Sequence, residues 1–208
     1  DLKYINAYSS LRHCGMVLFA ILMLNTTAMT GAIMQMLSHG LMTALFFALI
    51  GMIYGRTHTR DIRKMGGLMQ IMPFLGVGYV IAGLANLGLP GFSGFVAEMT
   101  IFVGSFAHAD MFHRVLTIMA CSAIVITAVY ILRVVGKILF GPLYKIEKVG
   151  DQYNYVSEHH GEVHHYPLRD AIWYEKIATI GLIVSIAIIG LYPVWISDMI
   201  SESLAAVA

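Results

Sequence analysis

The chain has 208 residues, of which 58% are hydrophobic and 12% are charged, and its formal net charge at pH 7 is +1. Soluble domains contain about 45–50% apolar and about 25% charged residues, so this composition excludes a water-soluble globular domain and a disordered chain. Because the net charge is close to zero, it also argues against a nucleic-acid partner.

Long uncharged runs follow one another along the chain. No Asp, Glu, Lys or Arg occurs in the 43 residues from His13 to Gly55, and none occurs in 115–132 or 177–197. Between Met65 and Ala109 the one charged residue is Glu98. About 20 apolar residues suffice to cross a bilayer, and in lipid the backbone is satisfied by helices or closed barrels. Since the alternation typical of barrel strands is missing, the sequence predicts an all-α polytopic membrane protein.

The expected elements can be placed in chain order. We predict helices at about 7–24, 28–54, 72–87, 95–107, 115–140 and 171–196, a basic loop at 56–64 and a polar segment at 142–170. The stretch 72–107 is interrupted at Pro90-Gly91, which prevents a continuous helix. It therefore reads either as two crossings or as one discontinuous crossing.

The distribution of positive charge decides between these alternatives, because Lys and Arg collect in loops on the cytoplasmic side. Four lie in the loop 56–64, four more lie between Arg133 and Lys148, and the C-terminal tail has none. A single discontinuous crossing puts both basic segments inside. We therefore expect five crossings in one bundle over 1–208, with 142–170 as a cytoplasmic or matrix-side loop. The opening residues lack an initiator Met and a signal peptide, so we expect a piece of a longer chain.

Glu98 is the strongest candidate for a functional residue. A charge at the bilayer centre costs about 2.5–3.5 kcal/mol, so such residues are rare and mark functional sites. The half-helix that begins near Gly94 would have its N-terminus near mid-membrane, with the acid in its first turn near the positive end of the helix dipole. The alternative is an acid that holds helices together by pairing with a cation. Arg133 is a candidate for that counter-charge, or else an anchor for lipid headgroups.

Four further residues are candidates for proton relay. His13 and His39 lie in uncharged helices, and histidine titrates near neutral pH. The alternative is a neutral histidine hydrogen-bonded across helices, with Ser38 or Thr43 as the partner of His39. Lys3 reads as a proton entry point or a snorkelling anchor. His58 lies in the basic loop, where a solvated role is the expected one.

Cofactor and metal motifs are missing from the sequence. There is no GxGxxG, P-loop, GxSxG or HExxH pattern, and the two cysteines form no CxxC pattern. Glu158–His165 contains four His and two Glu and could bind zinc or nickel. Nothing in the segment fixes a coordination geometry, so we interpret it as a solvated loop and expect neither a metal nor a cofactor in this chain.

Several motifs resemble those of one family. They are Asp1-Leu2-Lys3 with Ala7-Tyr8-Ser9-Ser10-Leu11-Arg12-His13, Gln35-Met36-Leu37-Ser38-His39-Gly40-Leu41, Arg56-Thr57-His58-Thr59-Arg60-Asp61 with Gly66-Gly67-Leu68, and Leu87-Gly88-Leu89-Pro90-Gly91-Phe92-Ser93-Gly94-Phe95-Val96-Ala97-Glu98. In this order they resemble the antiporter-like membrane subunits of respiratory complex I. The likeness is to the subunit 4 group (subunit M) and its counterpart in the photosynthetic form of the complex, since the sister subunit L typically has Lys in place of Glu98.

The resemblance implies a function for these residues. It implies proton translocation driven by quinone reduction in other subunits, which would hold NADH, FMN, iron–sulfur clusters and quinone. Glu98 would be the terminal protonatable residue, with His39, His13, Lys3 and His58 at relay positions. The expected partners are other membrane-arm subunits, including neighbouring antiporter-like chains, in a bacterial inner membrane or otherwise a mitochondrial inner or thylakoid membrane.

The resemblance has limits, and other readings stay open. The chain matches the C-terminal part of the family and lacks the first symmetry repeat, while Arg12 and Cys14 stand where the family more often has a small residue and Met. The same motifs serve cation/proton antiporters and membrane-bound hydrogenase subunits. A purely structural half of a split subunit is a further alternative, as is metal transport through the His-rich segment.

Overall fold

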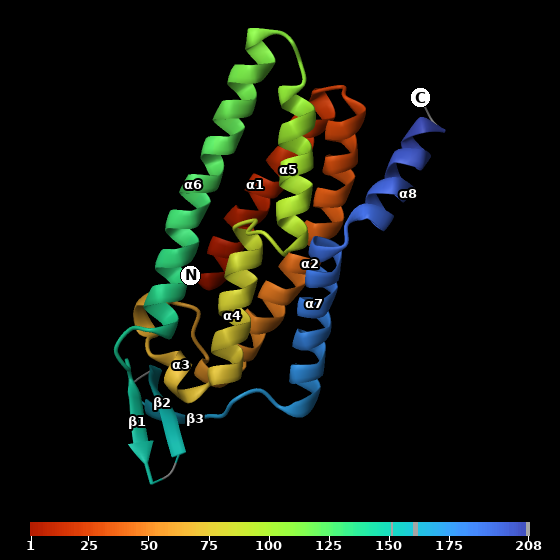
Figure 1. The fold of residues 1–208 in the computed structure, drawn as a ribbon. Coiled ribbons are helices and arrows are strands. Elements are labelled where there is room, and N and C mark those ends of the chain that lie inside the picture. Colours follow the sequence, from red (N-terminus) through yellow and green to blue (C-terminus); the bar gives the residue numbers. More distant parts are fainter. Residues whose placement is uncertain (151, 160–161, 207–208) are drawn as a thin grey trace.

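The structure, a computed structural model, describes residues 1–150, 152–159 and 162–206. It is an elongated helix bundle with a small sheet at one end (Figure 1). Its helices are α1 (Leu2–Leu22), α2 (Thr26–Thr57), α3 (Leu68–Ile71), α4 (Pro73–Asn86), α5 (Ser93–Phe106), α6 (Met111–Leu139), α7 (Trp173–Leu191) and α8 (Val194–Ala205), with a 3-10 turn at Ile62–Lys64. The strands are β1 (Ile146–Val149), β2 (Gln152–His159) and β3 (Glu162–Leu168). The predicted helical membrane fold is confirmed.

Local sequence signals explain where the central helices begin. The Asn25 side chain accepts hydrogen bonds from the backbone amides of Thr27 and Ala28, so it caps the start of α2. Pro73 opens α4, a position where its missing N–H costs nothing. The Asp170 carboxylate, from the link between β3 and α7, accepts from the next two amides of α4 and ties these distant segments together.

The stretch around Pro90-Gly91 is a single discontinuous crossing, as predicted. α4 and α5 run in the same direction, one after the other, and the residues between them include Gly88 at φ 67° and Gly91 at φ 98° (Figure 1). Positive φ is a conformation that glycine adopts without steric cost. α2 lies at the centre of the bundle against α1, α4, α5 and α7. The chain therefore passes along the bundle five times, in α1, α2, α4 with α5, α6, and α7.

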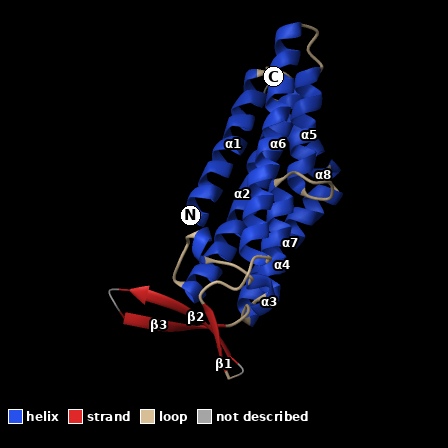
Figure 2. Ribbon diagram, turned by 90° about the vertical axis from the view of Figure 1, so that its left-hand side faces the viewer, coloured by secondary structure: helices blue, strands red, loops and turns tan. Residues whose placement is uncertain are grey.

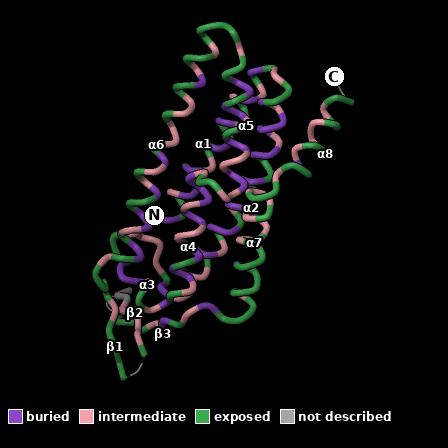
Figure 3. The backbone as a smooth tube through the Cα atoms, viewed as in Figure 1, coloured by how far each residue is buried: buried purple, intermediate pink, exposed green. Residues whose placement is uncertain are grey.

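The surface of the bundle is apolar over long stretches. α2, α6 and α7 are long and apolar enough to cross a membrane. Exposed residues follow much of α6 (Figure 3), among them Val125, Ile126 and Val129, each more than 60% exposed. Exposed aliphatic side chains in a continuous row match a lipid-facing surface. This is the surface of an integral membrane protein.

The polar segment 142–170 contains more structure than the expected loop. Its strands form an antiparallel sheet in the order β1-β2-β3, in which Tyr155 pairs with Ile146 on one side and Tyr166 on the other (Figure 2). The Tyr155 hydroxyl donates to the Lys64 carbonyl at 3.1 Å. The two basic segments therefore lie at the same end of the bundle, which is the arrangement that the charge distribution predicted.

The last helix is also divided, where the sequence suggested one helix over 171–196. α7 ends at Leu191, and α8 begins after Pro193 and turns away from the α7 axis (Figure 1). Pro193 has no amide hydrogen to continue α7. Near this end, the backbone of Gly190 lies directly against Gly91 and Phe92. The end of α7 therefore packs against the break between α4 and α5.

Candidate functional site

Glu98 lies beside the break, buried at 3% exposure. α5 begins at Ser93, so Glu98 falls in its second turn, and the expectation of an acid in the first turn is wrong. The helix dipole acts mainly within the first turn, so its effect on Glu98 is smaller than the sequence suggested. A Cβ at Gly88 would lie 3.0 Å from Glu98 Oε2, so the backbone of the break covers the carboxylate directly.

Arg12 is the ion-pair partner of Glu98, and it comes from α1. Its Nη2 donates to Glu98 Oε1 at 2.9 Å, and the two side chains are 10% and 4% exposed. The same nitrogen donates to the backbone carbonyl of Asn86 at 3.1 Å. Asn86 is the last residue of α4, where carbonyls lack helical partners and the dipole favours a cation. The break therefore creates a binding position for the Arg12 guanidinium.

His13 joins this pair from the same helix. Its Nδ1 lies 3.7 Å from Glu98 Oε1 and accepts a hydrogen bond from Gln35 Nε2 at 2.6 Å. Its Nε2 lies 3.1 Å from Asn86 Oδ1 and 3.2 Å from Arg12 Nη2. At 1% exposure, the ring is fully enclosed by these polar partners.

His39 extends the cluster along α2. Its ring stacks on that of His13 with centroids 4.9 Å apart, and it bonds with Thr43 at 3.3 Å. Ser38, the other partner that the sequence suggested, bonds instead with Ser93 at the start of α5 at 2.7 Å. The structure therefore brings Glu98, His13 and His39 into one group, which we call the Glu98 cluster together with Arg12, Asn86 and Gln35.

Polar residues continue from this cluster along the buried face of α1. Ser9 donates to Asn86 Oδ1 at 2.9 Å, and Asn6, one turn earlier, is 5% exposed. Asn6 Nδ2 has no hydrogen-bond partner among the described residues. Asn6 and Tyr79 line an enclosed cavity of about 10 Å³. Such a volume accommodates about one water molecule. In the other direction the same face becomes apolar at Met16 and Ala20.

Lys3 and His58 lie away from the Glu98 cluster, at the end with the basic loops. Lys3 is exposed at the start of α1, about 14 Å along the helix from Arg12. His58 caps the C-terminus of α2 with φ 51°, and its ring stacks on that of Tyr166 with centroids 4.0 Å apart. Leu2 N donates to the Arg60 carbonyl at 3.0 Å, which brings the start of α1 against the loop that follows His58.

Some members of the cluster escaped the sequence analysis. The sequence offered Arg133 as the counter-charge of the buried acid, but Arg133 is exposed in the wall of a cavity of about 330 Å³ with Lys137. Asn86 could have been found from the sequence, because it is a lone amide side chain at the end of an apolar stretch. Of the His-rich segment, residues 160 and 161 and the side chains of 158, 159 and 162 lie outside the described residues.

Comparisons of the sequence with known proteins all indicate the same family. Residues 1–151 match the family described as NADH:quinone oxidoreductase/Mrp antiporter, transmembrane. The chain is 36% identical over 202 residues to NAD(P)H-quinone oxidoreductase chain 4 of Gloeobacter violaceus, and 38% identical over 196 residues to the protein of the same name from Acaryochloris marina. These alignments cover 96% and 93% of this chain but 36% and 34% of the relatives. The chain thus spans about a third of their length.

Solved structures share the fold. A chain of respiratory complex I from Thermus thermophilus superposes with a TM-score of 0.74 at 22% identity, over 95% of this chain and 38% of that one. A chain of the Mrp complex from Dietzia sp. superposes with a TM-score of 0.77 at 17% identity, over 94% and 41%. At these identities the likeness establishes the arrangement of helices.

Proposed function

The chain belongs to the NADH:quinone oxidoreductase/Mrp antiporter family of transmembrane proteins, and on that premise we propose that it moves protons across an energy-transducing membrane. It would act as a membrane-arm subunit of a quinone-reducing oxidoreductase, as the names of its relatives suggest. Because it spans about a third of those relatives, it would supply one section of the proton path.

The observation that carries this proposal is the Arg12–Glu98 pair at the break, with the His13 ring 3.7 Å from the same carboxylate oxygen. Glu98 would take up and release the proton. His13 and His39 would pass it on, since an imidazole can accept at one nitrogen and donate from the other. Buried groups that exchange protons in this way need polar neighbours, which Asn86 and Gln35 supply.

Arg12 would couple the protonation of Glu98 to a charge in a neighbouring subunit. Its guanidinium keeps its charge under all conditions relevant here. When a proton moves onto Glu98, the carboxylate loses its charge and Arg12 loses its ionic partner. Nε and Nη1 of Arg12 are buried and have no hydrogen-bond partner in the described part of the chain, so they offer donors for another anion. A carboxylate from a neighbouring subunit would then respond to the proton on Glu98.

Entry of protons would follow the polar face of α1. Lys3 and His58 lie at the end of the bundle with the basic loops, and Asn6 and Ser9 lead from there to Asn86. We assign Lys3 and His58 to this entry side. We place redox chemistry in other subunits, which would hold NADH, FMN, iron–sulfur clusters and quinone. Other membrane-arm subunits, including neighbouring antiporter-like chains, would be the partners.

The test is Glu98→Gln in the assembled complex, reconstituted in vesicles, with proton uptake measured against quinone reduction. We expect proton transfer through this chain to slow by about 10²-fold or more, the contribution typical of a positioned proton-transfer group. The matched control is Glu202→Gln on the exposed side of α8, which should change nothing. Unchanged proton-to-electron stoichiometry and rate in Glu98→Gln, with normal assembly, would refute the proposal.

A further inference from the structure

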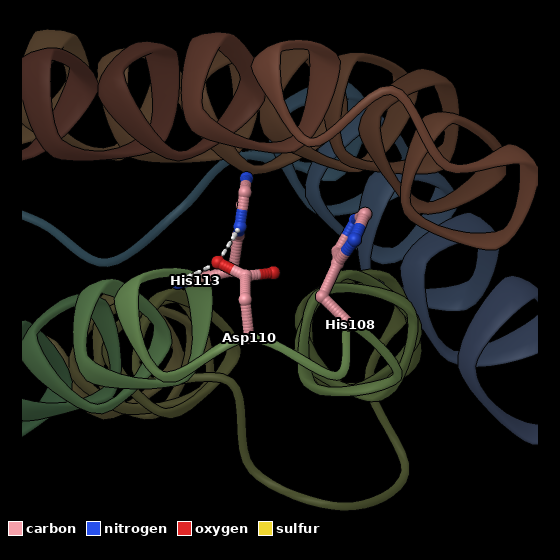
Figure 4. Close-up of side chains that lie close together, drawn as sticks. All are labelled: His108, Asp110 and His113. Carbon is pink, nitrogen blue, oxygen red and sulfur yellow. Dashed lines mark hydrogen bonds and ion pairs between the residues drawn. The ribbon is translucent and has the colours of Figure 1, made fainter.

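Three potential metal ligands gather in the turn between α5 and α6. His108 follows α5, Asp110 precedes α6, and His113 lies in its first turn. One ligand atom from each lies within 4.8 Å of the others. Figure 4 shows Asp110 between the two imidazoles, with one carboxylate oxygen bonded to His113 and the other on the side of His108. This turn is at the opposite end of the bundle from the basic loops (Figure 1).

A second contact orients the His108 imidazole. His108 Nε2 lies 2.8 Å from the carbonyl of Met23, which caps the C-terminus of α1, and can only donate to it. The lone pair of His108 is therefore on Nδ1. A metal-binding histidine usually donates its other ring N–H to a carbonyl or carboxylate, which fixes its tautomer. His113 Nδ1 lies 2.6 Å from Asp110 Oδ2, and an ion bound by these two atoms would replace the proton between them. The rings of His108 and His113 stack with centroids 4.5 Å apart.

Charge and access also suit a cation. Asp110 supplies a carboxylate, and such a group is ionised at neutral pH. Both histidines are half-buried and Asp110 is exposed, so an ion can enter from solvent. The nearby cation, Arg114, donates from Nε to the backbone carbonyl of His108 at 3.1 Å, and its guanidinium lies 6.0 Å from the centre of the Phe106 ring.

Helix capping explains part of this arrangement. Asp110 caps α6 by accepting from the His113 amide at 3.3 Å. Capping requires neither the stacked His108 ring nor its bond to α1. Two imidazoles and a carboxylate are a ligand set that Zn²⁺ accepts, at about 2.0–2.2 Å each with water in the fourth position. Ligand atoms around such a tetrahedral ion are about 3.3 Å apart. The separations of up to 4.8 Å would therefore have to shorten, and the 2.6 Å contact between His113 and Asp110 would have to lengthen.

We propose that His108, Asp110 and His113 bind a divalent transition-metal ion, with Zn²⁺ as the best match. The ion joins the end of α5 to the start of α6, and through His108 it also fixes the end of α1. Since α1 and α5 carry Arg12 and Glu98, a metal here fixes the far ends of the two helices that form the ion pair.

The test is a titration of the purified chain in nanodiscs with Zn²⁺, and with Co²⁺ for its absorption spectrum. The background variant has His159, His160, His164 and His165 replaced by Gln, which removes the competing His-rich segment. We expect one ion per chain, a tetrahedral Co²⁺ spectrum and a metal-dependent rise in Tm.

Three substitutions in this background separate metal binding from capping. Asp110→Asn keeps a cap of equal quality, His108→Gln keeps a donor for the Met23 carbonyl, and His113→Gln removes the third ligand. Each should weaken Zn²⁺ binding by at least about 10-fold, the loss seen when even an outer-shell partner is removed. The apo chains should keep nearly the same Tm. The proposal is overturned if the background variant binds no Zn²⁺, or if Zn²⁺ binding is unchanged in each of the three singly substituted chains.

Discussion

The Arg12–Glu98 pair should behave as one energetic unit. The two side chains are 10% and 4% exposed and 2.9 Å apart. Removing one partner of such a buried pair costs about 3–5 kcal/mol because the other charge stays buried alone. Arg12→Met and Glu98→Gln should each lower the free energy of unfolding by about that amount. The double variant should lose only about 1–3 kcal/mol, the cost of leaving the Asn86 carbonyl without its donor.

The measurement is a double-mutant cycle on the chain in lipid bicelles, unfolded by titration with a denaturing detergent. We expect an interaction free energy of about 3 kcal/mol or more. The control cycle pairs Arg133→Met with Glu98→Gln, because Arg133 is exposed and was the alternative counter-charge. That cycle should be additive within about 0.5 kcal/mol. Additivity in the Arg12 cycle, or coupling in the Arg133 cycle, would refute the assignment of Arg12 as the partner of Glu98.

Two further predictions concern the break and the basic loop. A Cβ at Gly190 would overlap the backbone of Phe92, so Gly190→Ala should destabilise the chain by about 1–3 kcal/mol. A Cβ at Gly181, on the same helix, would meet open space, so Gly181→Ala should stabilise the chain by up to about 1 kcal/mol. Equal changes in the free energy of unfolding for the two variants, measured by detergent titration, would contradict this. Hydrogen bonds from Arg63 lower the pKa of Asp61 to about 2, so they are intact above pH ~4 and break as the pH falls through 2. The NMR shift of the Arg63 amide should follow that transition, and Asp61→Asn should abolish it.

The sequence was sufficient to predict the crossings and the position of the break. Proline cannot continue a helix, and Gly88 and Gly91 adopt the positive φ that glycine permits. The direction of the chain after the break followed from the clustering of Lys and Arg at one end. These features depend on local stereochemistry and on the membrane, so they are visible without knowledge of packing.

The ion-pair partner of Glu98 could not be predicted from the sequence. Arg12 and Arg133 are both arginines near apolar helices, and sequence spacing cannot say which one faces the buried acid. The choice depends on the rotation of α1, which is set by the packing of its small and polar face against α2. The division of α7 from α8 and the sheet in 142–170 also depend on contacts between distant segments, such as Gly190 with Phe92 and Tyr155 with Lys64.

The contacts that hold the break differ in how they depend on charge. Packing of Gly190 against the break and the hydrogen bond between Ser38 and Ser93 do not change when a proton moves. The Arg12 guanidinium, by contrast, bonds both to the end of α4 and to Glu98 on α5. It therefore bridges the two half-helices through an interaction whose strength depends on the charge of Glu98. Neutralising that carboxylate would weaken the bridge while the other contacts persist, so the relative position of α4 and α5 is what a proton on Glu98 would change.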